Sequence, residues 1–364
     1  MLLCLTGGEL SLKDRFNFNR DVSFNNLTRE RLSELESVPR TGLRLVCDYL
    51  ICLMPVLAGC MALAEYILIP NLKDNTSTQV YIYFIAALTA AAVIFFIAAF
   101  KSRKTFYMLR YKAPFYALVF ILLAVYDYLT LKTGILVLPY FPWCDQILNA
   151  IIDDHAYLLD CAGNSILLLF SGYFYGAVLG LITGTACGCS RTADYWLSPF
   201  MKLLGAIPSP TWIPVVMVIA SSLFAGSVFI IALGVWYAMT IATMTGIRNI
   251  DRYFYDAAKT LGASRIKLVF HVALPFAVPN ILQGLTQGMS SACMALITAE
   301  MVGVESGLGW YISWQKSWAQ YGKMYAAIVL LCVIFVSVNW GLNRIKRYML
   351  RWQERVSAFD YGAV

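Results

Sequence analysis

Eight long apolar segments constrain this chain more than any other feature of its sequence. They run from about 44 to 70, 79 to 100, 112 to 131, 162 to 187, 197 to 221, 226 to 246, 275 to 301 and 324 to 345. Each is long enough to cross a hydrocarbon layer of about 30 Å as a helix. Across the 364 residues, 60% are hydrophobic and 13% are charged, whereas about 25% are charged in soluble domains. We therefore predict an all-α integral membrane protein.

Lysine and arginine lie in every second loop, and this alternation predicts the orientation. Basic clusters occupy 101–112, 248–267 and 344–355, whereas 71–78 carries one lysine and 139–159 and 221–227 carry no lysine or arginine. Cations collect in short cytoplasmic loops, so the basic loops and both termini are predicted to be cytoplasmic. This explains the net charge of +7 without a nucleic-acid partner, since no basic patch is interleaved with aromatic residues.

The basic stretch KSRKTFYMLRYK separates the first two apolar segments from the other six. We predict a cytoplasmic tail over 1–43, two additional spans and a basic loop over 44–111, a six-span core over 112–355, and a short tail over 356–364. The N-terminus lacks the basic start and apolar core of a cleaved signal peptide.

The sequence lacks the residue groupings that catalysis or metal binding requires. Ten cysteines are scattered, mostly in apolar segments; Cys144 and Cys161 could meet on the outer side, and Cys187 and Cys189 form a CxC pair that no further ligand completes. The two histidines have no ligand at motif spacing, and no GxxxxGK phosphate-binding loop occurs. We therefore predict no metal site, no catalytic residues and no nucleotide-binding site in this chain.

Two apolar segments carry a patterned helix face. The fourth has a glycine stripe at four-residue spacing, which predicts close packing against another helix; its members are Gly172, Gly176, Gly180 and Gly184. The seventh carries a polar face made of Gln283, Gln287, Ser290, Ser291 and Thr298. Such side chains are unfavourable against lipid, so this face is predicted either to form hydrogen bonds between helices or to line a path for a solute.

The cytoplasmic stretch over 247–274 is too long and too regularly patterned for a simple loop. Charges alternate with apolar residues as in two short helices, Gly262 offers a turn, and Pro275 opens the next span. Small residues beside this turn would form a projection that the groove of a soluble partner could hold.

The segment DAAKTLGASRIKLVFHVALP resembles the signature of importer permeases of the ATP-binding-cassette (ABC) superfamily, which reads EAA, three residues, G, nine residues, IxLP. The matching residues are Asp256, Ala257, Ala258, Gly262, Val272, Leu274 and Pro275, with Asp in place of Glu and Val in place of Ile. The resemblance covers about 112–355 and is closest to permeases for nitrate, sulfonates, taurine and thiamine precursors. Further stretches that carry it are LPYFPWCDQIL, IPSPTWIPVVMV, TGIRNID and AEMVGVESGLGWYI.

This resemblance implies a type I ABC importer permease fold in a bacterial inner membrane, with a six-span core and two extra N-terminal spans. It implies four kinds of partner: a second permease copy in a homodimer, two ATPase subunits, an extracytoplasmic binding protein and membrane lipid. ATP and Mg²⁺ would be bound by the ATPases, with no cofactor in this chain. The signature residues would couple the permease to the ATPases.

The segment after the seventh span is a candidate outer gate or docking surface, with Glu300, Gly307, Gly309 and Trp310 as its residues. Interfacial anchoring by its aromatic residues is the alternative. An ion-coupled secondary transporter remains the alternative for the whole chain, although the paired broken helices or intramembrane acids expected of that class are not evident.

Overall fold

The computed structural model describes residues 42–72, 75, 77–101 and 103–350. These residues contain helices and no strand. The chain forms two compact units, one made of Met1–Val137 with Trp143–Asp145 and the other of Leu138–Pro142 with Gln146–Val364. Both predicted tails lie almost wholly outside the described residues.

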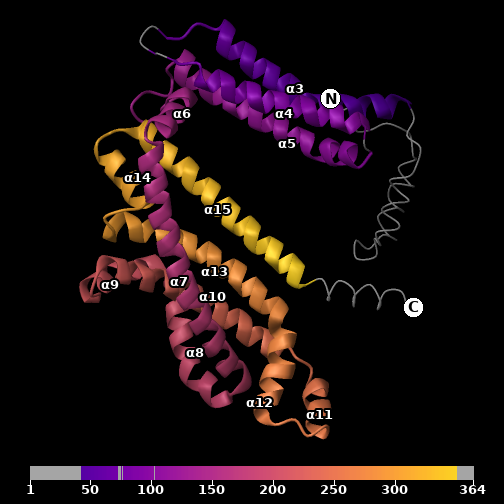
Figure 1. Ribbon diagram of the computed structural model, residues 1–364, viewed down its shortest axis with the longest axis vertical. Coiled ribbons are helices and arrows are strands. Elements are labelled where there is room, and N and C mark those ends of the chain that lie inside the picture. Colours follow the sequence, from indigo (N-terminus) through magenta and orange to yellow (C-terminus); the bar gives the residue numbers. More distant parts are fainter. Residues whose placement is uncertain (1–41, 73–74, 76, 102, 351–364) are drawn as a thin grey trace, which may run out of the picture. The chain divides into compact units, whose positions relative to one another are not determined.

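The described part of the first unit contains three long helices and a turn of π-helix (Figure 1). They are α3 (Gly42–Leu68), α4 (Val80–Lys101), α5 (Arg103–Asp127) and the π-turn η3 (Tyr128–Lys132). Helix α5 packs on α3 through Ala58, Ala117 and Phe120, and Arg110 forms a 2.7 Å ion pair with the buried Asp48. The third apolar segment therefore packs with the first two. The predicted boundary at 111/112 falls inside α5, whereas the break in packing lies near residue 137, because hydropathy does not reveal which helix a span packs against.

The second unit contains four long helices and several short ones. They are α7 (His155–Cys189), α8 (Arg191–Ala206), the 3₁₀ turn η4 (Ser209–Trp212), α9 (Ile213–Ile219), α10 (Leu223–Arg248), α11 (Arg252–Thr260), α12 (Arg265–Leu268), the π-turn η5 (Val269–Ala273), α13 (Leu274–Gly303), α14 (Leu308–Ser317) and α15 (Tyr321–Met349). The short helix α6 (Cys144–Asp153) starts at the junction of the units.

Within the described residues, seven helices are long and apolar enough to cross a membrane. An eighth span exists only if a bent pair of helices is taken as one. The predicted fifth span over 197–221 corresponds to this bent pair, whose two helices meet at 90°, so it is not one straight helix. Pro208 and Pro210 lack backbone donors, and Ile207 before them has extended dihedral angles (φ −110°, ψ 119°), which end α8.

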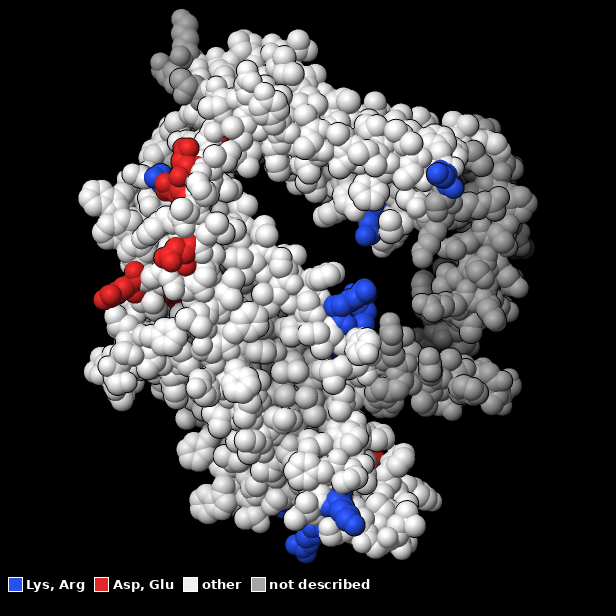
Figure 2. Space-filling model, in the orientation of Figure 1, with Lys and Arg blue, Asp and Glu red and all other residues white. Residues whose placement is uncertain are grey.

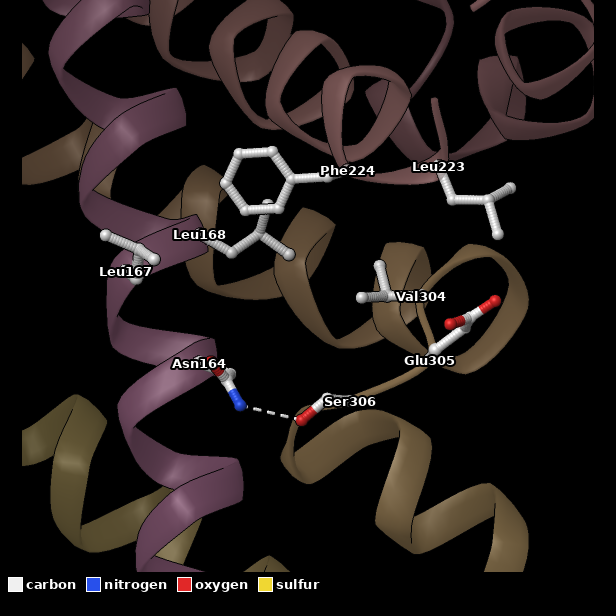
Figure 3. Close-up of a pocket in the computed structure, with 8 residues that line it drawn as sticks. All are labelled: Asn164, Leu167, Leu168, Leu223, Phe224, Val304, Glu305 and Ser306. Carbon is white, nitrogen blue, oxygen red and sulfur yellow. Dashed lines mark hydrogen bonds between the residues drawn. The ribbon is translucent and has the colours of Figure 1, made fainter. Parts of the chain in front are cut away.

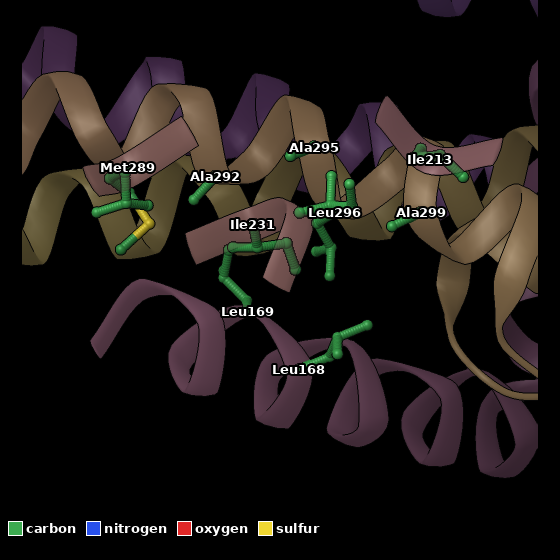
Figure 4. Close-up of a cluster of buried hydrophobic side chains, with 11 residues drawn as sticks. Leu168, Leu169, Ile213, Ile231, Met289, Ala292, Ala295, Leu296 and Ala299 are labelled. Atoms are coloured by element: carbon green, nitrogen blue, oxygen red, sulfur yellow. The ribbon is translucent and has the colours of Figure 1, made fainter. Parts of the chain in front are cut away.

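The core of the second unit lies where α10 packs between α7 and α13 (Figure 4). Leu168 and Leu169 of α7, Ile231 of α10 and Leu296 of α13 are buried there. Ile213 from α9 adds to the same cluster, so the bent segment is fixed to the core.

Glycines bring these three helices together. The four glycines of the α7 stripe are buried, and a Cβ on each would lie 2.5–2.7 Å from an atom of α10. On the other side, Gly284 and Gly288 of α13 meet α10, where a Cβ would lie 2.6 Å from Ala242 and 3.1 Å from Val235. Helix α10 is thus held between two glycine faces, and only the first was evident from the sequence pattern.

We predict that Gly176→Val destabilises the protein by about 1–3 kcal/mol, because the new side chain must displace the Ala232 carbonyl and Val235. Thermal unfolding of the purified protein in detergent measures the effect. The matched control is Gly163→Val on the same helix, where nothing lies within 4 Å of the added Cβ. Equal melting temperatures for the two variants would contradict tight packing at the stripe.

Candidate functional site

The signature segment folds into a helical hairpin made of α11 and α12. Asp251 caps α11 by accepting a hydrogen bond from the Tyr253 amide (3.3 Å), and Ser264 caps α12 by accepting one from the Lys267 amide (3.4 Å). Between the helices, Gly262 has a φ of +78°, a conformation that favours glycine. Its amide donates to the Lys259 carbonyl at 2.9 Å, which ends α11. The predicted turn at Gly262 is present.

The inner face of this hairpin is fixed to the membrane helices. Tyr255 packs against a buried cluster. Its members are Ile247 of α10, Ile250 in the loop after α10, Ala273 of η5 and Ala277 of α13. Next to Tyr255, the Phe254 ring lies 5.2 Å from the Phe276 ring. Movement of the hairpin would therefore act directly on α10 and α13.

The outer face of the hairpin is open. Tyr253, Leu261 and Ile266 are 83%, 88% and 72% exposed. The cations around them are Arg252, Lys259, Arg265 and Lys267, and basic side chains appear at this end of the second unit in Figure 2. Large apolar side chains exposed among charges are typical of a protein-binding surface.

The predicted coupling residues share this region but differ in exposure. Asp256, Ala257 and Gly262 are exposed, as is Pro275, whereas Ala258 and Leu274 are partly buried. Asp256 forms an exposed ion pair with Lys259 at 3.1 Å. The apolar residues Tyr253 and Ile266 were not among the predicted site residues, although their position among charges was a usable signal.

The polar face of α13 points away from the core. Gln283, Gln287 and Ser290 are exposed, whereas Ser291 and Thr298 are partly buried. Hydroxyl groups on this face bond to their own helix, as in the 3.1 Å bond from Thr298 to the Met294 carbonyl. Gln283 differs, because its Oε1 accepts a hydrogen bond from Lys346 of α15.

A cavity of about 160 Å³ joins this polar face to the bent segment. Ser291 and Met294 of α13 line it, with Tyr237 of α10 and the prolines of the bend. The four prolines in IPSPTWIPV and its neighbourhood were the signal for the bend that hydropathy averaging obscured.

The opposite end of α13 supports the start of α14. Glu300 is fully buried, and its Oε2 accepts a 2.7 Å hydrogen bond from the Gly309 amide. Ser165 of α7 accepts another from the Leu308 amide at 2.9 Å. A Cβ on Gly307 would lie 2.5 Å from Glu300, so a side chain there has no room.

Glu300, Gly307 and Gly309 are buried and hold the loop from inside, so they do not form an exposed docking surface, and their alternative role as an outer gate stays a prediction. The carboxylate suits this position because it meets the unpaired amides of a helix N-terminus. Trp310 is partly exposed and stacks on Trp314, with ring centroids 5.5 Å apart, and the exposed Trp318 follows. Trp310 alone of the four predicted residues reaches an accessible surface.

An open pocket of about 400 Å³ lies beside this loop (Figure 3). Leu167 and Leu168 of α7 and Phe224 of α10 form its apolar wall. Glu305 and Ser306 lie on its other side, where Ser306 accepts a 2.7 Å hydrogen bond from Asn164. Glu305 and Ser306 lie in the segment that was predicted as an outer gate or docking surface, whereas the lining residues of α7 and α10 were not predicted, because they come from separate segments.

Asp154 joins α14 and α15 at the same end of the unit. Its Oδ2 accepts a hydrogen bond from the Tyr311 hydroxyl (2.7 Å) and pairs with the Lys323 ammonium (2.8 Å). Burial alone would raise its pKa, but the hydrogen bonds from Lys323 and Tyr311 and the Lys323 charge hold the pKa below its ordinary value.

Comparisons with known proteins agree with the signature. Residues 176–351 match the family model of the binding-protein-dependent transport system inner membrane component. The putative aliphatic sulfonates transport permease of Bacillus subtilis is 29% identical over 182 residues, which are 50% of this chain and 66% of the relative. The corresponding Escherichia coli protein is 32% identical over 45% of this chain and 62% of the relative.

A bicarbonate transport system permease of Synechococcus elongatus is 28% identical over 52% of this chain and 66% of its own length. The matches to these first relatives thus span slightly less than two thirds of their length. A solved inward-facing MetNI methionine ABC transporter aligns with 54% of this chain and 98% of its own, at 21% identity and a TM-score of 0.48.

The all-helical architecture and the signature hairpin are those expected of a permease of the ABC importer class. Residues 176–351, just under half of the chain, resemble the family of binding-protein-dependent transport system inner membrane components. The resemblance to the branch with sulfonate and taurine permeases is confirmed by the relatives that match.

We predict that Asp154→Asn lowers the free energy of unfolding by about 1–2 kcal/mol at neutral pH, since it removes a charged hydrogen-bond acceptor. A group with a lowered folded pKa stabilises the protein above its unfolded pKa of about 4, and this stabilisation is lost as pH falls through the lower folded pKa. The difference between wild type and variant should therefore shrink in acid. Thermal unfolding of wild type and variant between neutral and acidic pH measures this stability difference, and Asp160→Asn, at an exposed position, is the control. A stability difference that does not change with pH would contradict the account.

Proposed function

We propose that this chain is the transmembrane permease subunit of an importer driven by separate ATP-binding-cassette ATPases. The observation that supports it most is the signature hairpin, which is exposed on its outer face and anchored on its inner face through Tyr255. In this proposal ATP and Mg²⁺ are bound by the partner ATPases, in whose groove the α11–α12 hairpin sits.

Coupling then follows from the anchoring. When the ATPases close on ATP, the seat of the hairpin moves, and α10 and α13 move with it because Ile247, Ile250, Ala273 and Ala277 pack together. A second permease copy completes the path in a homodimer, and the pair alternates between inward-open and outward-open states.

The path runs along the polar face of α13. Gln287, Ser290 and Ser291 line it, and Thr298 lies toward its outer end. The cavity beside the proline bend opens onto this face at Ser291 and Met294. Gln283, held by Lys346, serves helix packing at the inner end.

The cargo is a small solute of the kind named for the relatives, which include sulfonate, taurine and bicarbonate permeases. An extracytoplasmic binding protein delivers it beside the exposed tryptophans of α14. The distribution of charge in the second unit supports an inner-membrane orientation with both termini cytoplasmic. Cations surround the hairpin, and acidic side chains gather at the opposite end (Figure 2).

Gly262→Asp tests the docking. The substituted residue would enter a left-handed conformation with strain and place a charge in the interface, so we expect loss of ATPase co-purification or of coupled transport into vesicles with insertion unchanged. Gly262→Ala introduces the backbone strain without the charge, so it separates the two effects. The matched control is Gly42→Asp, because Gly42 is another exposed glycine with open space around it. Wild-type binding and transport by Gly262→Asp would remove the main support for the proposal.

Gln287→Leu tests the path. We expect solute uptake to fall at least several-fold while assembly with the ATPase is retained, because the substitution removes a polar group from the exposed face without touching the core. Cys332→Leu, on the exposed surface of α15, is the control. Unchanged uptake would assign the face to helix packing alone.

Orientation is tested by cysteine labelling with a membrane-impermeant maleimide, after subtraction of wild-type labelling. Lys259→Cys should react only from the cytoplasmic side and Glu305→Cys only from the outer side, since these exposed residues lie at opposite ends of the second unit. The reverse pattern would overturn the predicted topology.

A further inference from the structure

The first unit contains a buried polar cluster that the proposed transport mechanism does not use. Glu65 lies in the last turn of α3, Asp127 ends α5, and Lys132 ends η3. Asp127 is fully buried and Lys132 is 7% exposed. Lys132 follows Asp127 closely in the sequence, but none of the ion pairs among described residues joins them.

Lys132 instead caps the end of α3. Its Nζ donates to the Tyr66 carbonyl (2.8 Å), the Ile69 carbonyl (2.6 Å) and Asn71 Oδ1 (2.8 Å). A cation at a helix C-terminus is favourable, and these three bonds use the donors of the ammonium.

The acids of this cluster have no such partners. Both carboxylate oxygens of Glu65, both of Asp127 and the hydroxyl of Tyr81 are buried and make no hydrogen bond to any residue that the structure describes. The charges of Glu65 and Lys132 both act on Asp127, and the charge of Lys132 also acts on Glu65.

The number of cations in the cluster limits how many of its carboxyl groups can be ionised. Asp145 is also buried, but its carboxylate accepts hydrogen bonds from the Thr78 amide (2.6 Å) and the Tyr81 amide (3.1 Å) at the start of α4. Glu65 and Asp127 then remain with a single cation, Lys132. A second ionised carboxylate would be buried without compensation, which is strongly unfavourable.

We propose that Glu65 and Asp127 form a proton-binding site in the N-terminal unit, in which one of the two carboxyl groups carries a proton at neutral pH while Lys132 stays charged. A proton fits better than a metal cation. No group of three metal-ligating side chains occurs among the described residues, and a cation would be repelled by Lys132. The groups facing the site are Glu65 and Tyr66 of α3, Tyr81 of α4, Lys132 of η3, and Cys144 and Asp145 of α6.

Infrared spectroscopy of the purified full chain tests this site through the C=O band of a protonated carboxyl group. We expect the band at neutral pH in wild type, with a shift in D₂O, and its loss in Asp127→Asn or Glu65→Gln. Glu300→Gln shows how much of the infrared band comes from the buried carboxyl group of the second unit. Asp153→Asn, at an exposed position, is the control and should leave the band unchanged. Lys132→Met should roughly double the site's band, because both acids must then be protonated.

Absence of a protonated carboxyl band in wild type at neutral pH would overturn the proposal, as would a band that both isosteric variants leave unchanged. A comparison of melting temperatures in sodium chloride and choline chloride adds a second measurement. Equal values support the proton, whereas a sodium-specific stabilisation that Asp127→Asn abolishes would replace it with a cation site. Because the wild-type measurements need no variant, a variant that fails to insert does not prevent the test.

Discussion

The close approach of α10 to the glycine faces of α7 and α13 is the contact on which the second unit depends. Lipid provides no hydrophobic driving force between helices, so association requires backbones that approach closely and pack well. Gly176 and Gly180 on one side, with Gly284 on the other, allow this approach because a Cβ would meet backbone or side-chain atoms of α10 at 2.5–2.6 Å. The three helices therefore form one closely packed core.

That core joins the signature hairpin to the loop before α14. At one end, Tyr255 packs against residues of both α10 and α13, so the signature hairpin is an extension of the core. At the other, Glu300 of α13 holds the Gly309 amide and so fixes the start of α14. Displacement of the hairpin can thus be transmitted along α13 past its polar face to the outer loop.

Much of this architecture could be predicted from the sequence, because burial in lipid requires long apolar helices and the signature has fixed spacing. Gly262 was placed correctly in a turn, since few other residues enter its conformation. The 90° bend at Pro208 was missed, because averaged hydropathy does not register a break. The burial of Glu300 was missed too, because its partner at Gly309 becomes evident only once α14 folds back. The Asp127 site required contacts between three segments that no linear pattern relates.

The most direct test of the central claim is photo-cross-linking from the hairpin in the assembled, ATPase-active transporter. A photoreactive amino acid in place of Leu261, which is 88% exposed at the turn, should form an adduct with the ATPase subunit. The same group in place of Val218, which is 85% exposed on α9, should form none. An active complex that yields no ATPase adduct from position 261, or equal adducts from both positions, would contradict the assignment of this hairpin as the coupling element.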